Sequence, residues 1–163
     1  MIVGRGDIAS ILNDREGAIF FVSGVSNSSE TKESEFLREI ELLNKQDRTK
    51  CLFYFSSISV DDIEKVGTNK YLQHKLRMEF LIKSNFENHN IIRIGNITWG
   101  SNPNTFINYI KNKKQKGEPV EIKDEYKYVI DKEQIILLTD NLPLKGKNTI
   151  SAFGKMAKVN ELI

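Results

Sequence analysis

The chain has 163 residues, 39% of them hydrophobic and 28% charged, with a net charge of +2. This composition is ordinary for one globular domain, and the length suffices to bury a core without disulfides. The close balance of 24 basic and 22 acidic residues gives no general attraction to nucleic acid. One cysteine and two histidines are too few for a disulfide framework or a zinc site, so we expect no metal. No apolar run reaches membrane-spanning length and no signal peptide is evident, so we expect no membrane partner and a cytoplasmic location.

Short apolar runs alternate with helical patterns in the first part of the chain. Residues 1–3 predict a short strand, and residues 7–13 predict a helix with its apolar residues on one face. The run 18–22 is wholly apolar, which is typical of a strand covered on both faces. Residues 33–44 predict a second helix. Its expected packing positions are Phe36, Leu37, Ile40 and Leu43.

The same alternation continues further along the chain. Strands are predicted over 51–55 and 90–94, and helices over 69–83 and 105–114. The expected packing positions of the helix over 69–83 are Leu72, Leu76, Met78 and Phe80. Beyond Gly117 the pattern predicts shorter elements, namely strands over 120–122 and 126–130, a helix over 135–138, and one strand and one helix within 148–163.

This order of elements predicts an α/β fold, with a parallel Rossmann-like sheet and helices on both faces. The character of the sequence changes near Pro119. We therefore expect a main sheet domain over residues 1–117 and a small C-terminal lobe over residues 118–163 packed on it.

A glycine loop follows the first predicted strand. The segment 4–9 has the form G-x-G-x-x-A between a strand and a predicted helix, which is the context of a dinucleotide-binding fingerprint. The glycines allow a tight turn and close approach to a pyrophosphate, and an arginine can grip a phosphate. An ordinary strand-to-helix turn with two glycines is the alternative. The candidate cofactor-binding residues here are Gly4, Arg5, Gly6, Asp7 and Ile8.

The second half of that fingerprint is not visible. A complete site has an acidic residue about 20 positions further on, which binds the adenosine ribose. Here the next strand runs into Ser23 and Gly24 without a carboxylate. The sequence therefore does not distinguish NAD from NADP.

Tyr71 and Lys75 form a Y-x-x-x-K pattern on the helix predicted over 69–83. Residues four apart share a helix face, and an ammonium beside a phenol favours the phenolate needed for acid–base chemistry. Ser57 follows the strand over 51–55, at the sheet edge where ligands bind, and could hydrogen-bond a reacting oxygen. The alternatives are two helix-surface residues and a helix-capping serine.

The order of these motifs resembles the extended short-chain dehydrogenases, in particular the NAD-dependent epimerase/dehydratase family. The matching segments are 53–60, the Tyr71–Lys75 pair, 92–97 and 21–26. The resemblance implies catalytic roles for Ser57, Tyr71 and Lys75. It also implies cofactor contacts from Lys75, from Asn96, and from Ser23 and Gly24 at the end of the family's fourth strand. The family's second and third strands have no counterpart before residue 18, so the chain is similar to a shortened member with a reduced sheet.

Two functions follow from the resemblance. The first is an enzyme that moves a hydride between NAD or NADP and a nucleotide-sugar-like substrate, with epimerase, dehydratase and reductase all open. Asp61 and Asp62 are candidate extra acid–base groups for a dehydratase, or solvated loop residues. The second is a catalytically degenerate binding, regulatory or scaffolding protein on the same fold.

Loss of those strands would leave residues 1–3 at the edge of the sheet, to be covered by the chain itself or by a partner. A homodimer through the helices over 33–44 and 69–83 is one expectation. The other is that these helices merely cover their own sheet.

Overall fold

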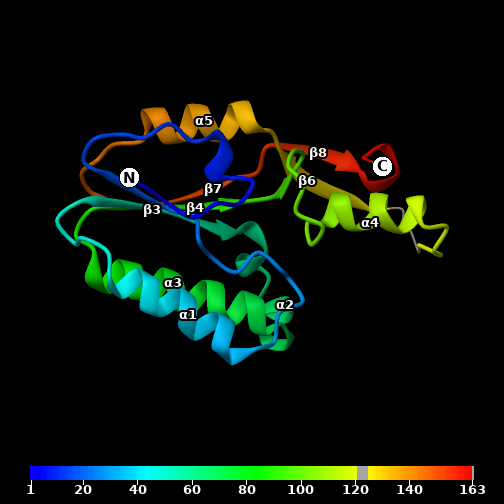
Figure 1. Cartoon of the computed structure of the whole chain (residues 1–163), viewed down its shortest axis with the longest axis horizontal. Helices are drawn as coiled ribbons and strands as arrows, with labels where there is room; N and C mark the ends of the chain where they lie inside the picture. Colours follow the sequence, from blue (N-terminus) through cyan, green and yellow to red (C-terminus); the bar gives the residue numbers. More distant parts are fainter. Residues whose placement is uncertain (121–124, 163) are drawn as a thin grey trace.

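The computed structural model describes residues 1–120 and 125–162. Its main feature is a five-stranded parallel sheet with the order β1-β2-β3-β4-β7. The strands are β1 (Ile2–Val3), β2 (Ala18–Phe21), β3 (Cys51–Ser57), β4 (His89–Ile94) and β7 (Lys147–Ala152). Figure 1 shows α1 (Glu33–Asn44) and α3 (Lys70–Asn85) on one face of the sheet and α5 (Lys132–Asn141) on the other. The predicted α/β fold with a parallel sheet is confirmed.

The inner strands are buried on both faces, as their continuous apolar runs predict. Every residue of β2 is buried, and its side chains alternate between two apolar clusters. Phe20 and Phe53 pack with Ile135 of α5, whereas Phe21 and the ring of Tyr54 pack toward α1 and α3. The two helical layers thus stabilise the sheet by removing apolar surface from water on either side.

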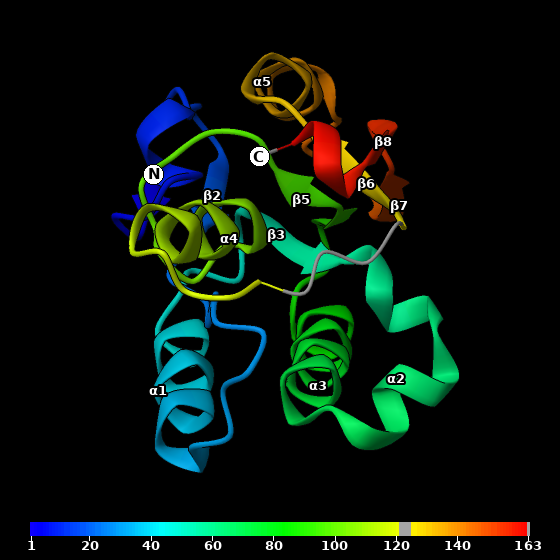
Figure 2. The ribbon, with the colours of Figure 1, turned by 90° about the vertical axis from the view of Figure 1, so that its right-hand side faces the viewer.

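A second, three-stranded sheet lies beside the carboxyl ends of the main strands (Figure 2). It consists of β5 (Asn96–Ile97), β6 (Tyr126–Ile130) and β8 (Lys155–Lys158), with α4 (Phe106–Gln115) next to it. β5 pairs with β6 in parallel and β8 pairs with β6 antiparallel. β5 precedes residue 117 but belongs to the small sheet, and β7 follows residue 117 but belongs to the main sheet. The expected division at residue 117 therefore does not coincide with the division between the two sheets.

The helix predicted over 7–13 is wrong. Only a 3-10 turn forms, at Ala9–Ile11. Ile8, Ile11 and Leu12, whose spacing suggested a helix, pack from this turn onto the α5 side of the sheet. The tail likewise differs from expectation, because it forms two strands, β7 and β8, and a 3-10 turn at Val159–Glu161.

The other predicted elements form with small changes in their bounds. The strand predicted over 120–122 falls mainly on residues outside the described part of the chain. A short helix that the pattern did not predict, α2 (Ile63–Thr68), precedes α3. β1 is an edge strand of the main sheet, as expected. Within residues 1–120 and 125–162, no helix has both the length and the apolar character needed to cross a bilayer.

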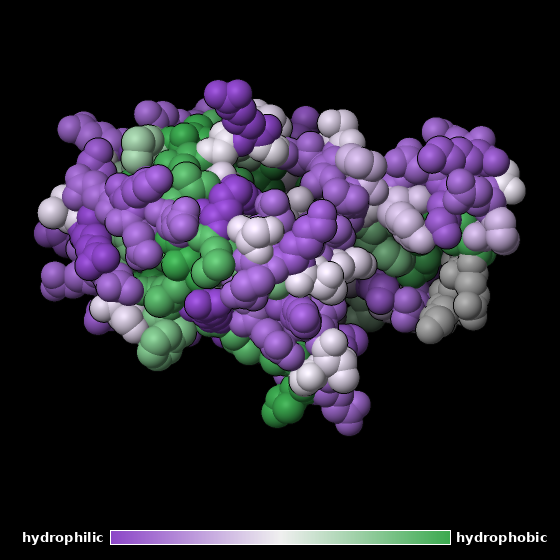
Figure 3. Space-filling view, turned by 60° about the horizontal axis from the view of Figure 1, so that its bottom comes forward, coloured by the Kyte–Doolittle hydropathy of each residue, from purple (hydrophilic) through white to green (hydrophobic). Residues whose placement is uncertain are grey.

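Two expected core positions face solvent instead. Leu37 of α1 is 44% exposed and Phe80 of α3 is 69% exposed. Figure 3 shows the side of the molecule that carries these helices, where apolar side chains lie between hydrophilic ones. On α1 the buried positions are Phe36, Glu39 and Leu43, so a carboxylate takes a place in the apolar stripe.

Candidate active site at the carboxyl edge of the sheet

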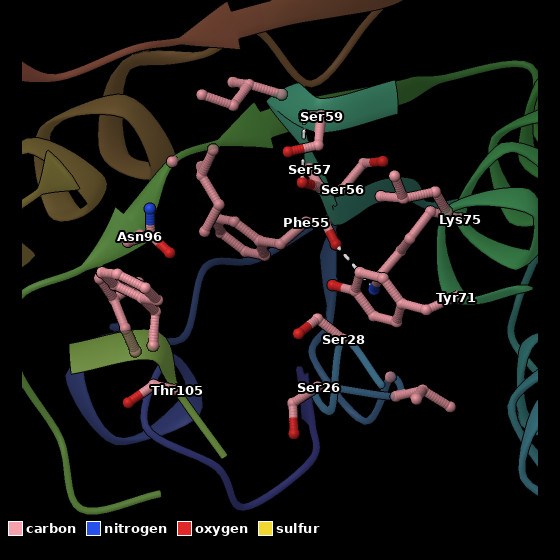
Figure 4. Close-up of a pocket in the computed structure, with 18 of the residues that line it drawn as sticks. Ser26, Ser28, Phe55, Ser56, Ser57, Ser59, Tyr71, Lys75, Asn96 and Thr105 are labelled. Carbon is pink, nitrogen blue, oxygen red and sulfur yellow. Dashed lines mark hydrogen bonds between the residues drawn. The ribbon is translucent and has the colours of Figure 1, made fainter. Parts of the chain in front are cut away.

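A cleft of about 1130 Å³ opens where β2, β3 and β4 end, which is room enough for a nucleotide-sized ligand. Segments far apart in the sequence line it, and Figure 4 shows side chains from several of them pointing into one cavity. Ten of the eleven predicted site residues line this cleft, and Gly4 alone does not. The ten are Arg5, Gly6, Asp7, Ile8, Ser23, Gly24, Ser57, Tyr71, Lys75 and Asn96.

Tyr71 and Lys75 are neighbours on α3, as their spacing predicts. The Lys75 Nζ lies 5.5 Å from the centre of the Tyr71 ring. In Figure 4 the Tyr71 hydroxyl points into the cavity, and the lysine reaches in beside it. α3 begins at this edge because the Asn69 side chain accepts a hydrogen bond from the Leu72 N–H and caps the helix. That cap sets the first turn, which carries Tyr71.

Ser57 ends β3 and is half-buried in the cleft wall. Its hydroxyl oxygen accepts a hydrogen bond from the Ser59 N–H at 3.2 Å and so caps the 3-10 turn at Ile58–Asp61. A hydroxyl that accepts in this way still has its own proton to donate. Ser57 therefore has the capping role considered as an alternative, together with a free donor at the cleft.

Lys75 is held by groups that the sequence did not reveal. Its ammonium donates to the Tyr54 hydroxyl at 3.1 Å and to the Phe55 carbonyl at 3.3 Å. The Tyr54 hydroxyl in turn donates to Oε1 of Glu39 at 3.0 Å. An ammonium has three N–H donors, so one remains for the cleft. The lysine is only 5% exposed, so water competes little with these two hydrogen bonds, and they restrict the direction of the third donor.

Glu39 is fully buried on α1 and carries a negative charge inside this network. Burial raises its pKa, but the nearby Lys75 ammonium and the hydrogen bonds from His74 and Val25 more than reverse this, and the pKa is about 2. The pKa of Tyr54 is raised well above its usual value, first by burial and then by the negative Glu39. Tyr54 therefore remains a neutral hydroxyl that bridges the carboxylate and the ammonium.

The glycine loop has one glycine that the fold requires and one that it does not. Gly4 has φ +136°, and a Cβ there would lie 2.5 Å from the Val22 carbonyl oxygen. A side chain at Gly6 would meet nothing within 4 Å. The space above Gly6 is open to the cleft, so this position suits the close approach of a ligand.

The Asp7 carboxylate is hydrogen-bonded to backbone N–H groups of the chain. It accepts hydrogen bonds from the N–H groups of Ser101 and Asn102, both at 3.0 Å. The Trp99 indole N–H donates to the Asp7 carbonyl at 3.2 Å. Asp7 thus ties the loop after β5 to the glycine loop. Because only a 3-10 turn follows the glycine loop, the loop does not lead into the helix N-terminus that was expected to attract a pyrophosphate.

Three further polar residues of the cleft have structural partners as well. Asn96 donates its side-chain N–H to the Tyr128 carbonyl of β6 at 3.1 Å. Asp61 accepts from Arg93 at 2.6 Å, and Asp62 caps α2 and pairs with Lys65 at 3.0 Å. The two candidate dehydratase carboxylates are therefore already bound within the chain.

Structures of known proteins share this architecture. One is MoeE5 in complex with UDP-glucuronic acid and NAD, with a TM-score of 0.67, 20% identity, and coverage of 90% of this chain and 60% of that one. Another is a mutant UDP-glucuronic acid 4-epimerase from Bacillus cereus, solved with a fluorinated UDP-sugar and NAD, with a TM-score of 0.67, 14% identity, and coverage of 94% and 59%. A third is a double mutant of DesIV, a dTDP-glucose 4,6-dehydratase from Streptomyces venezuelae with NAD bound, with a TM-score of 0.66, 11% identity, and coverage of 90% and 55%.

The chain shares the fold of these three proteins, which are extended short-chain dehydrogenases. The resemblance predicted from the motifs is confirmed at the level of the fold, and the chain spans about 60% or less of these three proteins. No protein-family model matches the sequence, and no curated protein matches it significantly. The extended short-chain dehydrogenase fold therefore rests here on three-dimensional structure and not on sequence identity.

Proposed function

We propose that this chain binds NAD or NADP in the cleft and acts on a hydroxyl or carbonyl group of a nucleotide-sugar-like substrate. The observation that carries this proposal is the meeting of Ser57, Tyr71 and Lys75 with the open Gly6 position in one cleft. Structural neighbours that were solved with NAD, two of them also with a UDP-sugar, support it. Epimerase, dehydratase and reductase activities share the oxidation or reduction step and remain open within it.

The cleft fits one end of the dinucleotide better than the other. Gly24 lies close to Lys75 at this end, because a Cβ at position 24 would come within 3.4 Å of the ammonium. Lys75 has a free N–H there for a ribose hydroxyl, and Ser23 and Asn96 line the same space. At the phosphate end the chain offers Arg5 and backbone N–H groups in place of a helix N-terminus.

The chemistry of the chain's own residues follows from their positions. As a phenolate, Tyr71 takes the proton of a substrate alcohol, and as a hydroxyl it gives its proton to a carbonyl oxygen; the Ser57 hydroxyl donates a hydrogen bond to that same substrate oxygen. The Lys75 ammonium stabilises the negative charge that Tyr71 carries after giving up its proton. A bound nicotinamide would accept a hydride from the substrate carbon in the oxidation, or donate one to it in the reduction.

Titration with NADH and NADPH, followed by fluorescence, tests the proposal. We expect saturable binding by the wild-type chain and its loss in Gly6→Asp, because the new carboxylate meets the phosphates. Gly67→Asp is the matched control, since Gly67 of α2 also has nothing within 4 Å and does not line the cleft. Retained dinucleotide binding by this control would support the cofactor site. Turnover of a nucleotide sugar in a subsequent screen would support the enzyme. No binding of either dinucleotide at millimolar concentration would overturn the proposal.

The second candidate function is a degenerate binding or regulatory protein. The observation that favours it is the 3-10 turn at Ala9–Ile11 where a pyrophosphate-binding helix was expected. Binding of a nucleotide sugar without binding of NADH or NADPH would identify this alternative.

A further inference from the structure

One buried carboxylate connects two walls of the cleft. Glu39 accepts three hydrogen bonds: from the Tyr54 hydroxyl at 3.0 Å, from the Val25 N–H at 2.9 Å, and from His74 Nε2, which lies 2.8 Å away. Because an ionised carboxylate can only accept, His74 must carry its proton on Nε2. Glu39 is 0% exposed and His74 is 3% exposed, so water does not compete for these bonds.

The first of these walls is α3, where Glu39 is linked to Lys75. The two charges are bridged by the neutral Tyr54 hydroxyl, which accepts from the ammonium and donates to the carboxylate. The Lys75 Nζ also lies 4.9 Å from the centre of the Tyr54 ring. An ammonium taken out of water is expensive unless it is paired and hydrogen-bonded, and Glu39 is the buried negative charge linked to it.

The second wall is the loop that follows β2. Glu39 holds this loop through the Val25 N–H, one residue after Gly24, which lines the cleft. A Cβ on Gly24 would lie 2.7 Å from Glu39 Oε1, so the loop backbone passes directly over the carboxylate. Position 24 must therefore stay small for the loop to come this close. A shift of Glu39 would move both the ammonium and the loop.

We propose that Glu39 is a positioning residue, which sets the Lys75 ammonium and the Gly24–Val25 loop at the correct separation for a nicotinamide ribose. This inference rests on the proposed function for its ligand. It goes beyond that function because Glu39 lies on α1, outside the cleft lining, and acts through Tyr54 and Val25. His74 orients the carboxylate from the side away from the cleft, and its ring stacks on Phe36 with centroids 4.5 Å apart.

The direct test is an NMR spectrum of the lysine ammonium groups in the whole chain without ligand. A buried and hydrogen-bonded ammonium exchanges its protons slowly, so we expect a Lys75 ¹⁵N–¹H signal in the wild type, assigned by its loss in Lys75→Arg. Glu39→Gln has one acceptor oxygen for three donors, and we expect it to lose both the Lys75 signal and the protection of the Val25 amide. Tyr54→Phe removes only the bridge, and we expect it to lose the Lys75 signal and keep Val25 protected.

Glu79→Gln is the matched control. Glu79 is also buried, at 2% exposure on α3, but its carboxylate binds Arg93 and not Lys75. We expect this variant to keep the Lys75 signal and the wild-type affinity for NADH, whereas Glu39→Gln should weaken NADH binding about tenfold. A Lys75 signal that persists in Glu39→Gln, or NADH binding as tight as in the wild type, would overturn the inference. Failure of the wild type to bind NADH would overturn the proposed function, and the ammonium spectrum would still decide whether Glu39 holds Lys75.

Discussion

Two walls of the same cleft have very different supports. The α3 wall carries Tyr71 and Lys75 on a 16-residue helix, with a buried network behind it. The glycine-loop wall consists of a two-residue strand, an open loop and a three-residue turn. Lys75 is therefore fixed by burial and Tyr71 is half-buried beside it, whereas Arg5 and Gly6 of the glycine loop are exposed. This difference teaches that contacts within the chain preorganise the α3 wall, whereas the glycine-loop wall is built from short and open segments.

The largest effect is expected on the α3 wall. If the chain turns over a nucleotide sugar as proposed, we expect Tyr71→Phe to lower this turnover by about 10²- to 10⁴-fold, because the variant lacks the hydroxyl that the proposal assigns to proton transfer. NADH binding should change little, since the ring and Lys75 remain. Steady-state kinetics and a binding titration measure the two effects separately. Tyr109→Phe, at an exposed position of α4 outside the cleft lining, is the control. Unchanged turnover in Tyr71→Phe would remove this residue from the reaction.

The contribution of the Glu39 carboxylate behind the α3 wall to stability should depend on pH. The pKa of Glu39 is about 2 in the folded chain against an ordinary value of 4.5, so its ionised form stabilises the fold. This stabilisation is fully present above pH 4.5 and is lost as the pH falls from there to about 2. It corresponds to about 3 kcal/mol. We expect Glu39→Gln to be less stable than the wild type at neutral pH, with the difference in the free energy of unfolding shrinking through this range.

Urea unfolding at several pH values measures this difference. If the difference stayed constant between pH 6 and the lowest pH at which both chains fold, Glu39 would not be the titrating group. Burial raises the pKa of Glu79, but its hydrogen bonds from Arg93 outweigh this effect, so its pKa is also lowered and Glu79→Gln should show a pH-dependent difference of the same sign.

The sequence predicts local features of this cleft better than contacts between distant elements. The apolar run of β2 and the helical spacing of α1 and α3 are local patterns, and they predicted these elements well. The helix over 7–13 failed because Ile8, Ile11 and Leu12 also suit a 3-10 turn that packs on the sheet. The meeting of Tyr71 with Lys75 followed from their spacing alone.

Glu39 and Tyr54 could not be predicted, because their partners come from α1, β3 and α3 at once. The only local signal was a glutamate three residues after Phe36 and four before Leu43, within the apolar stripe of α1. Such a residue is buried only if another element supplies a partner, and the sequence does not show which one does.

The glycine-loop wall gives a matched pair of substitutions. We expect Gly4→Ala to lower the free energy of unfolding by about 2 kcal/mol, because φ is +136° and the new Cβ would press on the Val22 carbonyl. Gly6→Ala should leave stability nearly unchanged, since nothing lies within 4 Å of its Cβ. Thermal unfolding of both variants checks the prediction. Equal losses would mean that the two glycines have the same structural role.

The smallest effect is expected where the glycine-loop wall meets the loop after β5. Asp7→Asn keeps one acceptor oxygen for the N–H groups of Ser101 and Asn102, so we expect a loss of about 1 kcal/mol. The change should be local, with faster hydrogen exchange at these two amides and an unchanged α3. Asp140→Asn, at an exposed position of α5, provides the control. If NADH binding becomes tighter in Asp7→Asn while the amides exchange faster, the Asp7 charge opposes phosphate, and the weakness of this wall is electrostatic as well as structural.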